Sequence, residues 1–507
     1  MSRLKQTAIW ITLLSIFLKL LGFVRESMIA REFGVSNETD AFMIAFTFVT
    51  LILALIANGF NSAFLPKYVE KRKENIEEAE RNANGVLNYT TLFFLGISVV
   101  AYFFTPSIVE FLFGSRSEET LQITVDLTRV FFIFMVVIAL SGVLESYLQA
   151  RRIFVPTQLS KIMGTLMATL FIIFFADMWG IYSVAYGFVF GTFLGVCIQF
   201  GSLMYGGFKW MPKFKLDDEF GRKLMLLLAP ALLHSSVGHI NVFVNKMFAN
   251  RIETGAVTYL NNASLIMSIP STIFTTTIVA IIFTLLSEQA DNKEKFRETL
   301  YMGYQIGMMT LLPIAIGTLL VGKAVIAFIY EGGEFTAQDT ANTYFVLQLY
   351  IPIILTQGLL VIGVKGMYAQ GAAKRLLKIS STTILLNAAL NWLFIQPLGY
   401  PGLALSSSVV ALYYVTATTL AVYRDYDHSE LKKLVQLFFR VLVPSIIMAV
   451  PIVLIQQFTS IESLYALWRL LILVPIGVVF YVAGMYLFYR EGFRQMLRVV
   501  KDRKSMS

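Results

Sequence analysis

Runs of about twenty apolar residues recur along the whole chain and constrain its fold more than any other feature. In helical form, each run is long enough to cross a hydrocarbon core roughly 30 Å thick. Only 14% of the 507 residues are charged, whereas a soluble domain typically carries about 25%. The alternating strand pattern of a membrane barrel is absent from the sequence. The sequence therefore predicts an all-α polytopic membrane protein.

The apolar runs predict about 14 transmembrane helices. Lys and Arg gather in every second connection between them, and loops of that kind stay in the cytoplasm, so both termini are expected there. Because these basic residues form no single basic face, the net charge of +9 does not indicate a nucleic-acid-binding protein. The predicted spans are residues 8–33, 41–65, 87–112, 122–148, 157–177, 181–206, 224–249, 257–286, 300–330, 342–369, 378–397, 401–423, 435–458 and 466–489.

An internal repeat at an offset of about 220 residues relates the two halves of the chain. Gly142, Tyr147 and Gly180 recur as Gly363, Tyr368 and Gly399. The repeat predicts two parallel six-helix lobes followed by two C-terminal helices, which is a transporter plan with a substrate site between lobes. The predicted domains are a lobe at 1–208, a linker at 209–223, a second lobe at 224–424, two further helices at 425–489 and a basic tail at 490–507.

The sequence offers no enzyme site. His234 and His239 lie five residues apart, not the four that place two metal ligands on one helix face, and no phosphate-binding GxxxxGK[ST] loop exists. We therefore expect a transporter without a cofactor. The single cysteine, Cys197, lies in an apolar run and is expected to be a buried, unreactive thiol.

Ionisable residues inside the apolar runs are the candidate site. A charge at mid-bilayer costs roughly 2.5–3.5 kcal/mol, so such residues usually face a protein interior or a watery cavity. Lys19, Arg25 and Glu26 lie in or near the end of the first run, and Asp40 follows it. Lys365 lies within a later run. The excess of cations predicts a cleft that attracts an anionic ligand such as a phosphate or pyrophosphate.

Each of these residues also has a structural interpretation. Arg25, Glu26 and Asp40 could pair with one another or anchor the outer interface. Lys161, Lys246 and Arg129 lie close enough to the ends of spans to extend toward water. Gly22 permits a helix bend or a close backbone approach.

Three segments near the N-terminus are informative together, residues 20–26, 30–34 and 39–42. They closely resemble the opening of the MurJ/MviN family of lipid II flippases, which belongs to the multidrug/oligosaccharidyl-lipid/polysaccharide exporter superfamily. The resemblance continues in residues 59–66, in the turn at 335–336, at Tyr368 and in residues 402–404, and the predicted fourteen-span plan agrees with it.

The resemblance implies alternating access of two lobes that move an undecaprenyl-pyrophosphate-linked peptidoglycan precursor, lipid II, across the cytoplasmic membrane of a bacterium. Arg25 and Asp40 match family residues, and Lys19 stands where the family often has arginine. The family's cations hold the pyrophosphate, and a groove at the last two spans takes the lipid tail. Cell-wall synthesis proteins are expected partners. Weak cation-binding candidates, by position, are Asn245, Asn387 and Asn391, with Na⁺ or the membrane potential as the coupling force.

The chain departs from the family pattern near Leu53, Ala54 and Leu265, where family arginines are missing. Lys365 could compensate in part. Lipid II is the expected substrate. The alternatives are another undecaprenyl-linked saccharide, for teichuronic acid or exopolysaccharide, a cation-coupled small-molecule exporter, and a scaffold for wall-synthesis enzymes.

Overall fold

The computed structural model describes residues 3–114, 118–212, 214, 216–275, 279–289 and 292–494. Within these ranges it leaves out the side chains of residues 3–9, 12, 229–238, 280, 281, 283 and 284. Most of the predicted basic tail, and the side chain of His234, therefore lie outside the description.

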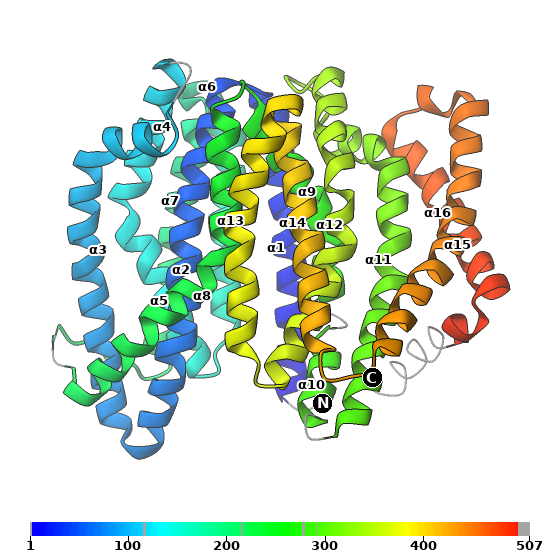
Figure 1. Cartoon of the computed structure of the whole chain (residues 1–507). Helices are drawn as coiled ribbons and strands as arrows, with labels where there is room; N and C mark the ends of the chain where they lie inside the picture. Colours follow the sequence, from blue (N-terminus) through cyan, green and yellow to red (C-terminus); the bar gives the residue numbers. More distant parts are fainter. Residues whose placement is uncertain are drawn as a thin grey trace. The chain divides into compact units, whose positions relative to one another are not determined.

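Helices make up nearly all of the described chain (Figure 1). The only β feature in these ranges is an isolated bridge between Gly332 and Phe335, so the predicted all-α class is confirmed. The helices are α1 (Arg3–Phe33), α2 (Asn37–Glu74), α3 (Ile76–Leu112), α4 (Glu118–Ile133), α5 (Met135–Ala150), α6 (Val155–Trp179), α7 (Tyr182–Tyr205), α8 (Asp218–Asn250), α9 (Ala256–Phe274), α10 (Ala280–Glu288), α11 (Lys293–Tyr330), α12 (Ala337–Ala369), α13 (Ala373–Leu398), α14 (Pro401–Val422), α15 (His428–Phe458), the 3₁₀ helix η2 (Ser460–Ser463) and α16 (Ala466–Phe488).

Each predicted span corresponds to one helix or to a broken pair of helices. The fourth span is α4 and α5, bent by 52° at their break, and the eighth is α9 and α10. Among the described residues, 9 helices are long and apolar enough to cross a membrane, or 10 if the bent pair is one span. The count of fourteen stays a prediction, since α9 and α13 carry many polar residues and α1 and α8 are described only in part.

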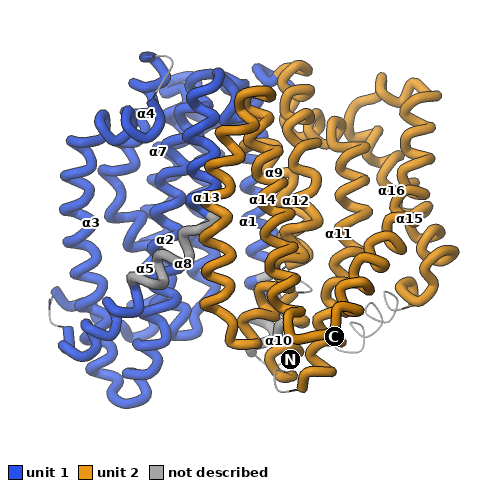
Figure 2. The backbone as a smooth tube through the Cα atoms, viewed as in Figure 1, with its two compact units in different colours: residues 1–258, 332–335 blue, residues 259–331, 336–507 orange. Residues whose placement is uncertain are grey.

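The chain forms two compact units (Figure 2). Unit 1 holds residues 1–258 and 332–335, and unit 2 holds residues 259–331 and 336–507. Helix α8 belongs to unit 1, where it packs along α2. The boundary between the lobes predicted from the repeat, at residues 209–223, comes earlier in the chain than the boundary between these two units. The division into lobes stays a prediction.

Unit 1 is held together by close packing of α6 and α7. Gly187, Gly191 and Gly195 follow one another at intervals of four along α7, and a side chain at Gly191 would lie 2.2 Å from the carbonyl oxygen of Met163. Small residues at this spacing let two membrane helices approach at backbone distance. Cys197, further along α7, is exposed, so the prediction of a buried thiol was wrong.

A polar cluster joins α2, α3 and α5 at one end of unit 1. The carboxylate of Glu80 accepts hydrogen bonds from the hydroxyls of Tyr68, at 2.6 Å, and of Tyr147. The guanidinium of Arg151 lies 3.4 Å from the same carboxylate. Two phenols and one cation therefore satisfy a carboxylate that would otherwise be costly to place inside the protein.

A short turn, residues 332–335, docks on the C-terminal end of α1 within unit 1. The backbone N–H of Glu334 donates to the carbonyl of Arg31 at 2.8 Å. Gly34 ends α1 with a φ of 59°, and a side chain there would lie 2.7 Å from the carbonyl oxygen of Glu334. Glycine is thus required at Gly34 by both conformation and space.

Unit 2 has its core between α11, α12, α15 and α16, around residues such as Tyr304, Leu311 and Tyr481. The hydroxyl of Tyr481 donates to the carbonyl of Met309 at 2.6 Å. Helix α15 begins after Asp427, whose carboxylate accepts from the Ser429 backbone, and hydrogen bonds from Ser429 lower the pKa of Asp427 below its usual value.

The two halves of the predicted repeat share one kind of helix ending. Gly180, after α6, has φ 53° and ψ −142°, and Gly399, after α13, has φ 67° and ψ −144°. Both conformations are ones that side chains rarely adopt, so the matched glycines in the sequence have a common backbone cause.

Candidate functional site

Arg25 and Glu26, near the end of α1, form an ion pair inside unit 1. The Arg25 side chain is 12% exposed and that of Glu26 is 5% exposed. The Arg25 guanidinium lies 4.9 Å from the centre of the Phe46 ring on α2, a cation–π contact. Its Nε is buried and has no hydrogen-bond acceptor among the described residues. Arg25 therefore keeps an unused donor for an anion.

Lys246, on α8, brings a second buried cation to unit 1. Its ammonium donates to the hydroxyl of Thr47 on α2 at 2.7 Å, and the residue is 9% exposed. The carboxylates of Glu26 and Asp40 lie close enough to interact electrostatically with this ammonium. The expectation that Lys246 extends to water at the end of its span is wrong, because α2 covers it.

Asp40, in the first turn of α2, is 2% exposed and has three donors. One carboxylate oxygen accepts from the backbone N–H of Gly255 at 2.6 Å. The other accepts from the backbone N–H of Thr258 at 2.9 Å and from its hydroxyl at 2.6 Å. The carboxylate thus supplies acceptors to the unpaired N–H groups at the start of α9, as a capping residue does.

Lys19 and Gly22 lie in a different setting on the same helix. Lys19 is exposed, and it makes no hydrogen bond or ion pair within the described ranges. A side chain built at Gly22 would meet nothing within 4 Å, so the predicted close backbone approach is wrong. Lys19 and Glu26 are seven residues apart on one helix, yet only Glu26 is buried.

The other predicted site residues divide between the units. Asn245 is half-buried on α8 in unit 1, whereas Lys365, Asn387 and Asn391 belong to unit 2. The Asn391 amide donates to the Asn387 side-chain oxygen at 3.4 Å, and both residues are buried. No group of three His, Cys, Asp or Glu side chains suited to a metal occurs among the described residues. Nothing in this geometry tests the cation-binding prediction.

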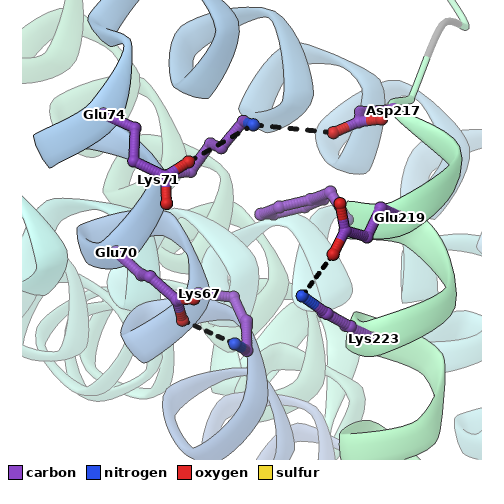
Figure 3. Close-up of a pocket in the computed structure, with 8 residues that line it drawn as sticks. Lys67, Glu70, Lys71, Glu74, Asp217, Glu219 and Lys223 are labelled. Atoms are coloured by element: carbon purple, nitrogen blue, oxygen red, sulfur yellow. Dashed lines mark hydrogen bonds and ion pairs between the residues drawn. The ribbon is translucent and has the colours of Figure 1, made fainter.

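A pocket of about 80 Å³ lies in unit 1 where α2 meets the start of α8 (Figure 3). Its lysines are already paired with neighbouring carboxylates: Lys71 lies 3.7 Å from Asp217, and Lys223 lies 2.5 Å from Glu219. With its cations neutralised in this way, the pocket does not suit an anionic ligand. Its lining residues are Lys67, Glu70, Lys71, Glu74, Asp217, Glu219, Phe220 and Lys223.

Comparison with known families identifies the chain. The family model described as lipid II flippase MurJ matches residues 29–475. The chain belongs to the MurJ family. The family match confirms the prediction of a flippase, a transporter rather than an enzyme, and the match begins within α1, just after Arg25 and Glu26.

Curated members of the MurJ family align over most of the chain. A probable lipid II flippase MurJ from Rickettsia prowazekii is 25% identical over 506 residues, 98% of each chain. A probable lipid II flippase MurJ from Buchnera aphidicola subsp. Acyrthosiphon pisum is 26% identical over 412 residues, covering 79% of this chain and 80% of its own. The lipid II flippase MurJ of Burkholderia cenocepacia is 26% identical over 416 residues, 79% of each.

Solved structures agree on the fold. A lipid II flippase MurJ in an inward closed conformation superposes with a TM-score of 0.82 at 23% identity, covering 95% of this chain and 99% of its own. An inward-facing multidrug resistance MATE family transporter of the MOP superfamily gives a TM-score of 0.66 at 12% identity, covering 83% of this chain and 94% of its own. The fold predicted from the resemblance is thereby confirmed.

Sequence reasoning missed Lys246 as a site residue. A lysine within an apolar helix could have indicated a buried cation. Because Lys246 is near the end of the run, its ammonium group was expected to reach water instead. Its partner Thr47 is 199 residues away, a contact that no local pattern reveals.

Proposed function

We propose that the protein moves lipid II from the inner to the outer leaflet of the bacterial cytoplasmic membrane by alternating access, with both termini in the cytoplasm. The match of residues 29–475 to the MurJ family carries this proposal. The alternation of basic loops along the sequence supports the orientation.

We infer that the pyrophosphate of lipid II binds at the buried cations of unit 1. Arg25 has a buried Nε without an acceptor among the described residues, and a guanidinium can present two parallel donors to phosphate oxygens. Lys246 adds a second positive charge, with Thr47 as a neighbouring polar group. Lys19, exposed earlier on α1 than Arg25, would attract the anion as a point charge without holding its orientation.

Glu26 gives this site a means to release its ligand. A pyrophosphate that binds Arg25 must compete with the carboxylate already paired to it. When the ligand leaves, the ion pair forms again and avoids an isolated buried charge, which would be expensive. The membrane potential can act on the charges of the site, since each elementary charge moved across it is worth about 2.3 kcal/mol per 100 mV. Na⁺ coupling through Asn245, Asn387 and Asn391 remains a proposal.

The function is tested by replacing an authentic lipid II flippase in a depletion strain. The wild-type chain should restore growth, and Arg25→Ala should fail to restore it. Arg25→Lys keeps a positive charge beside Glu26 and controls for loss of folding. Arg424→Ala removes an exposed arginine that makes no hydrogen bond or ion pair within the described residues, and it should behave as wild type. Growth supported by Arg25→Ala would refute the role of Arg25.

A second outcome of the same assay concerns the substrate. The chain has Leu53, Ala54 and Leu265 where the family resemblance led us to expect arginines. If the wild-type chain is well expressed but does not restore growth, the proposal of lipid II is wrong, and a flippase for another undecaprenyl-linked saccharide takes its place.

A further inference from the structure

A second, larger pocket lies within unit 2, between the first turns of α11 and those of α15. Its volume is about 320 Å³, at the lower end of the roughly 300–1,000 Å³ that ligand pockets usually have. It is separate from the residues of unit 1 to which we assign the pyrophosphate. Its lining residues are Arg297, Glu298, Tyr301, Glu430, Lys433, Gln436 and Arg440.

The charges of this pocket differ from those of the pocket in Figure 3. Glu430, which is 5% exposed, is neutralised by Lys433 at 2.7 Å and by Arg297 at 3.6 Å. Arg440 is exposed and has no hydrogen bond or ion pair in the part of the chain that the structure describes. Three cations against two carboxylates leave the lining with a net positive charge.

The position of Arg440 along α15 points to the membrane surface. The helix begins with charged turns and continues into a long apolar stretch, and Arg440 lies where one gives way to the other. Beside it on the helix, Val435, Phe439 and Val443 are exposed, at 57%, 59% and 42%. A cation next to exposed apolar side chains is the arrangement found at the boundary between lipid head groups and acyl chains.

We propose that this pocket binds the phosphodiester head group of an anionic phospholipid. The guanidinium of Arg440 donates to the phosphate oxygens, and Gln436 and the Tyr301 hydroxyl lie in the same lining as further donors. The acyl chains lie along the exposed apolar residues of α15. The lipid would fill a groove between α11 and α15 and so link the first turns of these two helices.

The proposal is tested on the purified full-length protein by native mass spectrometry after delipidation. Phosphatidylglycerol and phosphatidylcholine with the same acyl chains are added in separate samples. Wild type should retain phosphatidylglycerol in preference to phosphatidylcholine. Arg440→Gln should weaken this retention about fivefold, the effect expected for one basic residue near an anionic surface, and Arg440→Lys should restore most of it. Lys432→Gln is the matched control, because Lys432 is exposed on the same helix but does not line the pocket.

Three outcomes would overturn the proposal. One is equal retention of phosphatidylglycerol by wild type and Arg440→Gln. Another is equal retention of the two lipids by wild type. The third is displacement of the lipid by inorganic phosphate at low millimolar concentration, which would indicate a site for a free anion. Because Arg440 is exposed and makes no hydrogen bond or ion pair among the described residues, its variants should fold. None of these outcomes depends on lipid II transport.

Discussion

Asp40→Asn separates a structural from a substrate-binding role for this carboxylate. The substitution keeps the size of the side chain but replaces one acceptor oxygen with an NH₂ group. In the wild type, one oxygen accepts from Gly255 and the other accepts twice from Thr258. The amide can serve Thr258 with its remaining oxygen, but its NH₂ group then faces the N–H of Gly255.

The expected loss of stability follows from these contacts. A buried N–H left without an acceptor costs about 1–3 kcal/mol. The two bonds to Thr258 change from charge-assisted to neutral, and each loses about 0.5–1 kcal/mol. We therefore expect Asp40→Asn to lower the free energy of unfolding by about 3 kcal/mol, or the apparent Tm by roughly 3 °C for a chain of this length.

Fluorescence-detected size-exclusion chromatography after heating measures this shift on detergent-solubilised protein. Thr258→Val removes one donor to Asp40, and the double variant should lose less than the sum of the two single effects. Thr254→Val is the matched control, since Thr254 makes an exposed hydrogen bond to Asn37 and should shift the Tm little. An unchanged Tm in Asp40→Asn, together with lost transport, would refute the capping role and return Asp40 to the substrate site.

Two further predictions concern stability in the same assay. Lys246→Met should cost about 3 kcal/mol, because it removes a cation that acts on the buried charge of Glu26, and Lys246→Arg should cost less. Equal stability of Lys246→Met and wild type would contradict a stabilising electrostatic interaction between Lys246 and Glu26. Gly34→Ala should destabilise the protein by about 1–2 kcal/mol, because Gly34 has a left-handed φ and lies against Glu334. Gly22→Ala should be neutral or stabilising by up to about 1 kcal/mol, because the added methyl group meets nothing. A larger loss of stability in Gly22→Ala than in Gly34→Ala would contradict the turn geometry.

The sequence predicted the elements of this fold better than the contacts between them. Apolar runs locate helices reliably, because any segment in a membrane must satisfy its own backbone hydrogen bonds. The pairing of Arg25 with Glu26 was open to sequence reasoning, since the two are neighbours in the chain. The breaks inside the fourth and eighth spans were not, because bent and straight helices have the same hydropathy.

The contacts that define the candidate site join residues far apart in the chain. Asp40 lies 215 residues from Gly255 and 218 from Thr258. A single sequence shows that a carboxylate is present but not which N–H groups reach it. The same limit explains why Lys246 was expected in water, since only tertiary structure shows that α2 covers it.

The turn at residues 332–335 has a consequence for the order in which the protein is made. Unit 1 consists of residues 1–258 and these four residues, so roughly 75 residues must be synthesised before its last piece emerges, which takes about 4–15 s at ordinary ribosome speeds. During that interval the carbonyl of Arg31 lacks the N–H of Glu334. The first half of the protein therefore cannot complete its own fold during translation until helix α11 of the second half has followed it out of the ribosome.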